Sequence, residues 1–501
     1  MEPIISSSTY VLIAILATVL TTILLDYFRR RKVVMKILAK SGLKELPGPR
    51  AWPIIGSLHL MGGYEVPYQA FGVLARRFGQ VFRLQLGTQP CVVVNGLDNI
   101  REVLMAKGTH FDGRPDFQRF HQLFSGDKEN SLAFCDWSDI QKTRREMLQG
   151  HTFPRAFTSR FHLLDSIISQ ELTVMKQRLS EQPTHIKPLL LPACANIFTS
   201  YFCSKRFRTD NTAFLKMVRN FDEVFYEVNQ GCAADFLPWL LPFHSRRLGK
   251  MAEWSHEIRR FVVSSVMEDR MESWTEGQEQ MDFVDTLIDH IQSKRQPEMP
   301  YNTALFALED IIGGHSAVGN FIIKILAYIA TKPEVQRRIQ EEVDSATMGT
   351  RDVTLADRAI MPYTEGTVME VIRLIASPIV PHVATQDSSI AGFQVKKDTL
   401  VFLNNYELSM SPKLWSEPEA FKPERFISPE GRVVKPEHFL PFGGGRRSCM
   451  GYKMVQLISF STVASILQSF HIRPVEGHSY KVPIGNLALP HDTFCFNFEK
   501  R

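Results

Sequence analysis

The longest apolar stretch of the chain lies close to its N-terminus. Tyr10–Leu25 is almost wholly apolar and extends back to Ile4 and Ile5, so the run reaches about 20 residues, enough to span hydrocarbon as a helix. The basic run Arg29–Lys32 comes directly after it, and no Lys or Arg precedes it, a bias that keeps the C-terminal remainder of the chain in the cytosol. A cleaved secretory signal would have a basic start and a small-residue cleavage site, and both are missing. We expect a transmembrane anchor over residues 1–28.

A basic and proline-rich segment comes after the anchor. Prolines and glycines recur between Leu46 and Leu58, where they prevent a helix from continuing and stiffen the chain. We expect a hinge over residues 29–53 and a single large domain over residues 54–501.

The hydrophobic pattern in this domain is mostly helical. Residues 81–87 and 90–96 are rich in Val and Leu and predict two short strands. Most later segments repeat apolar residues at helical spacing, the longest from about Tyr301 to Thr331. The pattern predicts a mainly α fold with small β-sheets.

Composition narrows the class of protein. The chain has 501 residues, 44% hydrophobic and 22% charged, with a formal net charge of +5. That is ample for a large core, and no Lys or Arg tract stands beside stacking aromatics, so we expect no nucleic-acid partner. The seven cysteines are odd in number and scattered, which favours neither a disulfide framework nor a zinc site.

One cysteine stands in an unusual loop, PFGGGRRSCMGYKM, at residues 441–454. The loop matches no nucleotide-binding glycine motif. Apolar residues at helical spacing follow Cys449, so we expect it at a helix start, where the helix dipole, Arg446 and Arg447 favour a thiolate. Glycines let the backbone approach a flat group closely. A planar metal macrocycle fits this loop best.

The ordered positions Phe442, Gly445, Arg447, Cys449 and Gly451 resemble the haem-binding signature of the cytochrome P450 family. The resemblance implies a single, mostly helical domain that binds haem b (iron protoporphyrin IX), with the cysteine as axial ligand of the iron. It implies a monooxygenase that uses O2. The chain shows no flavin or nicotinamide motif, so the electrons would come from NADPH through a partner, NADPH-cytochrome P450 reductase.

A second family motif holds a haem propionate with the pattern W-x-x-x-R. Trp137, Gln141 and Arg144 stand at i, i+4 and i+7, which predicts one helical face. Gln141 occupies the position of the family's arginine, so Arg144 or Arg145 is the expected substitute. An ordinary basic surface helix with a buried Trp is the alternative. His382 matches the family's propionate-binding His or Arg, although a lone His is often an ordinary packed residue.

Three Glu-x-x-Arg pairs occur in the chain, at 257–260, 334–337 and 370–373. Only the last is followed by the family's later motifs. By resemblance, Glu370, Arg373 and Arg425 form a structural charge network beneath the haem. We expect the other two pairs on solvated helix faces.

The family's oxygen pocket departs from its usual sequence here. Gly313 and Gly314 lie inside the long apolar helix, where they either open a groove for a ligand or permit close helix packing. Most members continue with an acid and a threonine that relay protons, whereas this chain has Ser316 and Ala317. The resemblance therefore assigns Gly314, His315 and Ser316 to the catalytic site. We expect protons to arrive through water, His315, Ser316 or the substrate, with Ser316 favoured.

The stretch GGHSAVGN resembles one small group of the family, the insect Spook and Spookier group, which acts early in ecdysteroid biosynthesis. The resemblance implies a sterol substrate near 7-dehydrocholesterol and an enzyme on the cytosolic side of the endoplasmic reticulum membrane, in contact with membrane lipid. Two alternatives remain open: a haem-thiolate isomerase or dehydratase that needs no reductase, and a non-catalytic carrier of sterol or haem.

Overall fold

A computed structural model describes residues 44–501 except Ser180, together with Ala14, Ala17, Thr18, Thr21, Thr22, Leu25, Asp26 and Arg29. Most of the predicted anchor, residues 1–28, and most of the hinge, residues 29–53, lie outside the described residues. In the part of the chain that the structure describes, one helix is long and apolar enough to cross a membrane. That helix, Tyr301–Ala330, is mostly buried within the protein.

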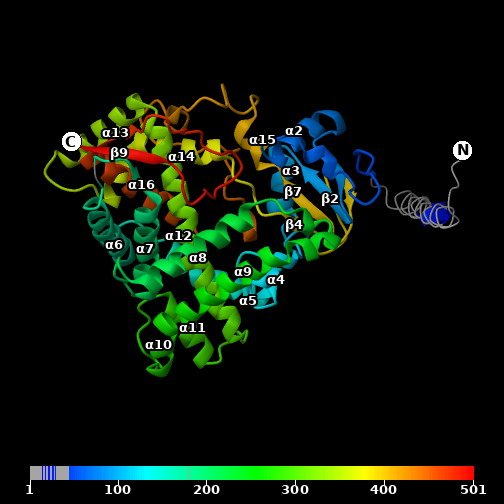
Figure 1. Ribbon diagram of the computed structural model, residues 1–501, viewed down its shortest axis with the longest axis horizontal. Helices are drawn as coiled ribbons and strands as arrows, with labels where there is room; N and C mark the ends of the chain where they lie inside the picture. Colours follow the sequence, from blue (N-terminus) through cyan, green and yellow to red (C-terminus); the bar gives the residue numbers. More distant parts are fainter. Residues whose placement is uncertain are drawn as a thin grey trace, which may run out of the picture.

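Helices make up most of the fold, as the apolar pattern predicts (Figure 1). The α-helices are Pro67–Phe78 (α2), Leu97–Arg101 (α3), Gln118–Leu123 (α4), Asp139–Thr152 (α5), Ser159–Lys176 (α6), Lys187–Cys203 (α7), Thr212–Asn229 (α8), Leu241–Val262 (α9), Glu268–Glu272 (α10), Phe283–Gln292 (α11), Tyr301–Ala330 (α12), Pro333–Thr347 (α13), Pro362–Ile375 (α14), Asn405–Met410 (α15) and Tyr452–Ser469 (α16). Shorter helical turns occupy Leu58–Met61, Glu102–Ala106, Lys128–Asn130, Ala233–Asp235, Pro238–Leu240, Val263–Met267, Leu355–Ile360, Pro423–Phe426 and Gly445–Arg447.

Three small sheets complete the described fold. Their strands are Val81–Leu86 (β1), Gln89–Val94 (β2), Thr184–His185 (β3), His382–Val383 (β4), Ser388–Ile390 (β5), Phe393–Val395 (β6), Leu400–Leu403 (β7), Phe470–Pro474 (β8) and Cys495–Lys500 (β9). The orders are β1-β2-β7-β4, β3-β9-β8 and β5-β6. The mainly α fold with small β-sheets is confirmed.

The four-stranded sheet joins residues far apart in the chain. β1 and β2 pair antiparallel, with Val81 opposite Val94, and β2 runs parallel to β7. β4 pairs antiparallel with β7, which sets His382 opposite Val401. Figure 1 shows this sheet beside α2 and α15, away from the main group of helices. The strand order thereby places His382 on an edge strand of this sheet.

Helix α12 forms the centre of the helical part. It contacts α7, α8, α14 and α16. It ends at Ala330, three residues before Pro333, and a proline there prevents the helix from continuing. The predicted helix from about Tyr301 to Thr331 is confirmed. Polar side chains buried along α12 are those of Thr303, Glu309, His315, Ser316, Asn320 and Lys324.

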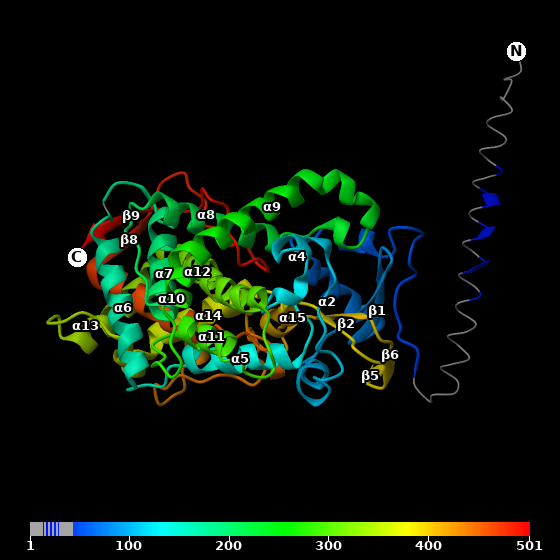
Figure 2. The ribbon, with the colours of Figure 1, turned by 90° about the horizontal axis from the view of Figure 1, so that it is seen from below.

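Helices α8 and α9 cover one side of this centre (Figure 2). They pack against each other, and α9 also contacts α4. Side chains of α4, α8, α9 and α12 therefore face a common interior.

Candidate active site

The cysteine loop has a backbone that only glycine fits. Gly445 has a φ of +63°, and a Cβ there would lie 2.1 Å from the carbonyl oxygen of Leu104. The loop folds back on itself, because the backbone N–H of Cys449 donates to the carbonyl oxygen of Phe442 at 3.0 Å. Among the described residues, Cys449 is the only exposed cysteine; Cys232 is half-buried and the rest are buried.

The surroundings of Cys449 act on its thiol in opposite directions. Although the side chain is accessible, desolvation by the protein that surrounds it raises the pKa of the thiol from its ordinary value. Backbone N–H groups of Gly451 and Tyr452 and the Arg145 guanidinium lower the pKa, but they do not offset this effect. Helix α16 begins at Tyr452, three residues after the cysteine. The expected stabilisation of a thiolate by backbone N–H groups after the cysteine is present, whereas the cation that acts on the thiol is Arg145 and not Arg446 or Arg447. A bound metal ion would supply the missing stabilisation, since a coordinating thiol is deprotonated.

Buried side-chain nitrogens without hydrogen-bond partners in the described residues lie near the cysteine loop. Arg447 donates from Nη2 to the carbonyl oxygen of Cys135 at 2.6 Å, whereas its Nε and Nη1 have no hydrogen-bond partner in the described part of the chain. His382 uses Nδ1 with the carbonyl oxygen of Phe111 at 2.6 Å, and its Nε2 is likewise buried without a partner. Buried polar groups are normally satisfied, so the two free nitrogens of Arg447 point to an anionic ligand. The Nε2 of His382 donates to such a ligand only when the ring is protonated, a form that a neighbouring carboxylate stabilises.

Arg114 belongs to the same cluster, and the sequence reasoning missed it. Its Nε donates to the carbonyl oxygen of Ala133 at 3.2 Å and its Nη1 to that of Pro381 at 3.4 Å. Burial and the charge of Arg447 hold the pKa of Arg114 well below its ordinary value, and burial, Arg114 and Arg447 do the same to the pKa of His382. The only signal for it in the sequence is a basic residue inside the stretch FDGRPDF, Phe111–Phe117.

The two arginines offered for the W-x-x-x-R motif have different surroundings. Arg145 donates from Nη2 to the carbonyl oxygen of Ser448, next to the cysteine, at 2.5 Å. Arg144 is fully buried and donates instead to backbone carbonyls, with the shortest contact at 2.7 Å to Asn130. Arg145 is thus the one that reaches the cysteine loop.

Trp137 does not share a helical face with Gln141 and Arg144, and that prediction is wrong. Helix α5 begins at Asp139, because the Ser138 side chain caps it by accepting from the N–H of Gln141. Trp137 precedes the helix, and the guanidinium of Arg446 lies 4.8 Å from the centre of its ring.

The structure separates the three Glu-x-x-Arg pairs as expected. Glu370 and Arg373 form a two-pronged ion pair at 2.7 and 2.8 Å, and Arg425 joins Glu370 at 3.3 Å. At residues 257–260 and 334–337 the pairing does not form. The glutamate of the first bonds Lys216 and Asn220, and the arginine of the second bonds Glu341.

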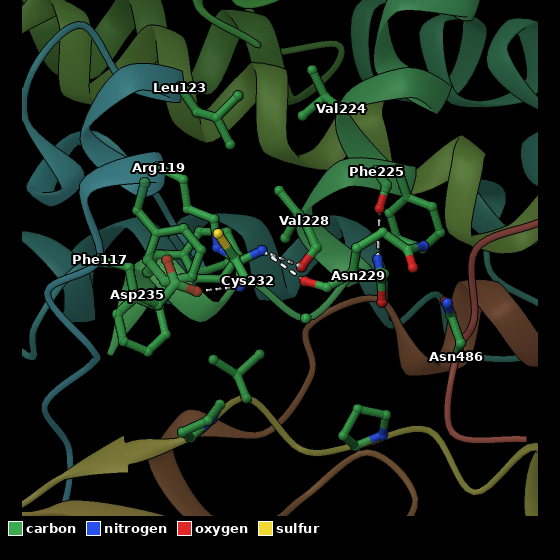
Figure 3. A pocket seen from close by; sticks show the side chains of 18 of the residues that line it. Phe117, Arg119, Leu123, Val224, Phe225, Val228, Asn229, Cys232, Asp235 and Asn486 are labelled. Carbon is green, nitrogen blue, oxygen red and sulfur yellow. Dashed lines mark hydrogen bonds and ion pairs between the residues drawn. The ribbon is translucent and has the colours of Figure 1, made fainter. Parts of the chain in front are cut away.

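An apolar cavity of about 610 Å³ lies beside α12. Phenylalanines and aliphatic side chains of α4, α8, α9 and α12 line it, and Figure 3 shows its α4 and α8 walls. Arg119 and Asp235 pair with each other there at 3.0 Å, and burial raises the pKa of Asp235 to about 6. The cavity is large enough for a small-molecule ligand, since such pockets measure about 300–1,000 Å³.

In the middle of α12, Gly313, Gly314 and Ala317 form part of the cavity wall. The two glycines also serve packing, because a Cβ would lie 2.9 Å from the Phe221 ring at Gly313 and 3.0 Å from the Phe198 ring at Gly314. The glycine pair therefore both lines the cavity and permits close packing of the neighbouring helices.

His315 and Ser316 are buried and are not part of that wall. The Nδ1 of His315 contacts the carbonyl oxygen of Ile312 at 2.7 Å, its ring meets Phe221 edge-on, and its Nε2 lies 3.4 Å from the Ser316 hydroxyl. Burial lowers the pKa of His315 to about 4. Of the three predicted catalytic residues, only Gly314 reaches the cavity, so the preference for Ser316 as proton relay lacks geometric support.

The cysteine loop and the buried, unpartnered nitrogens near it fit a haem. The accessible thiol suits an iron atom, and the unpartnered nitrogens of Arg447 and His382 suit propionate carboxylates. The class defined by this arrangement is a haem-thiolate protein.

Comparisons with known proteins agree with that class. A family model described as Cytochrome P450 matches residues 46–498. Cytochrome P450 307a1 of Drosophila melanogaster is 40% identical over 97% of this chain and 96% of its own length. Cytochrome P450 1A1 of Oryctolagus cuniculus is 32% identical over 92% of each chain, and that of Homo sapiens is 30% identical over 91% of this chain and 92% of its own.

The chain belongs to the cytochrome P450 family and is a monooxygenase of that family. Its resemblance to the family and to the insect Spook group is confirmed. Membership implies a haem, a redox partner that supplies electrons, an organic substrate and O2.

Proposed function

We propose that this monooxygenase oxidises a sterol in an early step of ecdysteroid biosynthesis, with 7-dehydrocholesterol as the substrate. The observation that carries the proposal is the apolar cavity beside Gly313, Gly314 and Ala317. Its size and aromatic lining suit a rigid, largely apolar molecule. The 40% identity to Cytochrome P450 307a1 of Drosophila melanogaster, together with the GGHSAVGN stretch, supports the insect steroid pathway.

Within the proposal, each part of the site has a separate task. Cys449 binds the iron of haem b, while Arg447, His382 and Arg145 hold its propionates, with Arg114 beside them. The phenylalanines of the cavity exclude water from the substrate. The bound haem supplies oxygen activation, which electron donation from a thiolate ligand favours.

We also propose the cellular setting. Residues 1–28 anchor the protein in the endoplasmic reticulum membrane, and the hinge at 29–53 holds the catalytic domain on the cytosolic side, against membrane lipid. Electrons come from NADPH through NADPH-cytochrome P450 reductase.

Turnover of a labelled sterol panel by the purified full chain tests the proposal. We expect oxidised 7-dehydrocholesterol only when NADPH, the reductase and O2 are all present. Turnover of other substrates, with every sterol unchanged, would reject the sterol assignment.

A second candidate is an isomerase or dehydratase that needs no reductase. The observation that favours it is Ala317, which contributes a methyl group to the cavity wall where most family members have a threonine. Product formation without reductase would select this candidate. Binding without turnover under every electron supply would indicate a carrier of sterol or haem.

A further inference from the structure

Glu309 is a buried acid on the wall of the cavity. It lies one turn before Gly313 on α12, and its side chain is only 6% exposed. Its Oε1 is buried and has no hydrogen-bond partner among the residues that the structure describes. An unsatisfied buried oxygen at a cavity wall is unusual, because such groups normally have partners.

The one cation close to Glu309 does not complete its bonding. The Nε of Arg259, on α9, lies 3.6 Å from Oε1, which is too long for a hydrogen bond. Arg259 is also engaged elsewhere, since its Nη1 donates to Ser125 and its guanidinium lies 4.0 Å from the centre of the Phe306 ring. The two facing atoms, Arg259 Nε and Glu309 Oε1, are both buried without a hydrogen-bond partner in the described residues, so the carboxyl group keeps capacity for a ligand.

Burial favours the neutral form of Glu309. Burial and the neighbouring Asp310 raise its pKa, Arg259 lowers it, and the result is about 8. At neutral pH the carboxyl group mostly keeps its proton, so it can donate a hydrogen bond as well as accept one.

The neighbouring acid, Asp310, differs from Glu309 because its carboxylate has hydrogen-bond partners. Asp310 also lines the cavity, but its Oδ2 accepts from the N–H of Leu132 at 2.6 Å and from the hydroxyl of Ser131 at 3.0 Å. Its role is to tie a loop to α12. Glu309 is thus the acid of this pair that remains available to a ligand.

We propose that Glu309 determines specificity by forming a hydrogen bond with one oxygen atom of an otherwise apolar substrate. The inference rests on the proposed function and names the group by which a sterol would be recognised, its hydroxyl. A site that hydrogen-bonds a hydroxyl strongly rejects the analogue without it, because the polar group of the protein is then left unpaired.

The test compares two matched ligand pairs bound to the purified holoenzyme. The probes are cholesterol with its 3-deoxy counterpart, and 1-hydroxypyrene with pyrene, each titrated through the optical shift of the bound haem. Wild-type protein should bind at least one hydroxylated probe about tenfold more tightly than its parent hydrocarbon. Glu309→Leu should lose the preference for the hydroxylated probe while it keeps its affinity for the hydrocarbon. Glu309→Gln should keep most of the preference for the hydroxylated probe.

Glu257→Leu is the matched control, because this α9 glutamate bonds Lys216 and Asn220 outside the cavity. Its hydroxyl preference should equal that of the wild type. An unchanged preference in Glu309→Leu, or no preference in the wild type for either pair, would overturn the inference.

Infrared spectroscopy gives a second readout if Glu309→Leu does not fold. A protonated carboxyl band that is missing in Glu309→Gln should shift on binding the hydroxylated probe and stay in place with the hydrocarbon. If neither sterol binds but 1-hydroxypyrene still binds more tightly than pyrene, the proposed sterol substrate is rejected. The role of Glu309 then stands.

Discussion

Glu370 and Arg373 form an ion pair in which neither side chain is exposed to solvent. Arg373 also donates to the carbonyl oxygens of Ser409 and Pro418, at 2.8 and 2.7 Å. One turn of α14 thereby holds the long connection that leads to the cysteine loop, so the pair stabilises the site without touching a ligand.

Glu370→Ala should strongly destabilise the protein. It leaves the Arg373 charge buried without its partner, a change that costs about 3 to 5 kcal/mol. Glu257→Ala removes a pair near the surface and should cost under about 1 kcal/mol. Urea unfolding and haem content per protein measure both variants. Equal losses in the two would contradict the assignment.

Cys449→Ala should abolish the thiolate spectrum of the reduced carbon monoxide complex, because no other cysteine in the described chain is exposed. Cys232→Ala, at the half-buried cysteine, should leave the spectrum intact. Difference spectroscopy of the reduced carbon monoxide complex measures both variants. A thiolate spectrum in Cys449→Ala would refute the assignment of Cys449 as the iron ligand.

Arg447→Met should weaken haem retention, because it removes two buried donors that have no protein partner in the described residues. Loss of one charge-assisted contact corresponds to about 1.5 to 3 kcal/mol, or more than tenfold in affinity. Transfer of haem to excess apomyoglobin measures the release rate. Arg432→Met, at an exposed arginine, is the control. Equal release from the two variants would contradict a propionate site at Arg447.

Lys324 should make stability depend on pH. It is fully buried, donates to the carbonyl oxygen of Asn486 at 2.5 Å, and burial lowers its pKa from 10.5 to about 7. Between those values the unfolded chain binds a proton that the folded protein lacks, so stability rises with pH over this window, by at most about 1.4 kcal/mol per pH unit.

Lys324→Met should remove that rise. Urea unfolding of both proteins between pH 7 and 9 measures the difference in slope. Lys413→Met, at an exposed lysine, should retain the wild-type slope. A slope in Lys324→Met equal to that of the wild type would show that Lys324 titrates normally.

Ser316→Ala should leave the product formed per NADPH consumed unchanged, because Ser316 does not line the cavity. Ala317→Thr, which adds a hydroxyl to the cavity wall, should change that ratio. Both are measured with a turned-over sterol and the reductase. A marked rise in peroxide release in Ser316→Ala would restore it as a proton relay.

Local patterns made much of this protein predictable. Strands at 81–87 and 90–96, the helix from about Tyr301 to Thr331 and the cysteine loop all follow from the spacing of neighbouring residues. Spacing is informative there because the α and β periods reflect the burial of one face. The Glu370–Arg373 pair required one step more, since its spacing occurs three times and only the order of motifs distinguished it.

Side-chain surroundings were decided by tertiary contacts. Trp137 lies outside α5 because the Ser138 cap starts the helix after it. His382 acquires its role next to Phe111, 271 residues away, and Arg114 joins it from the same distant segment. Ser316 and Ala317 are adjacent in sequence, yet only Ala317 faces the cavity.

The sequence by itself determined the family and the mostly helical architecture, and it singled out Cys449 as the proposed iron ligand, because these depend on short ordered motifs and periodic burial. Only the tertiary structure decided which polar groups are left unpartnered, those of Arg447, His382 and Glu309. A hydrogen bond depends on distance and direction between segments far apart in the chain, and on the water that burial excludes, and no local pattern encodes these.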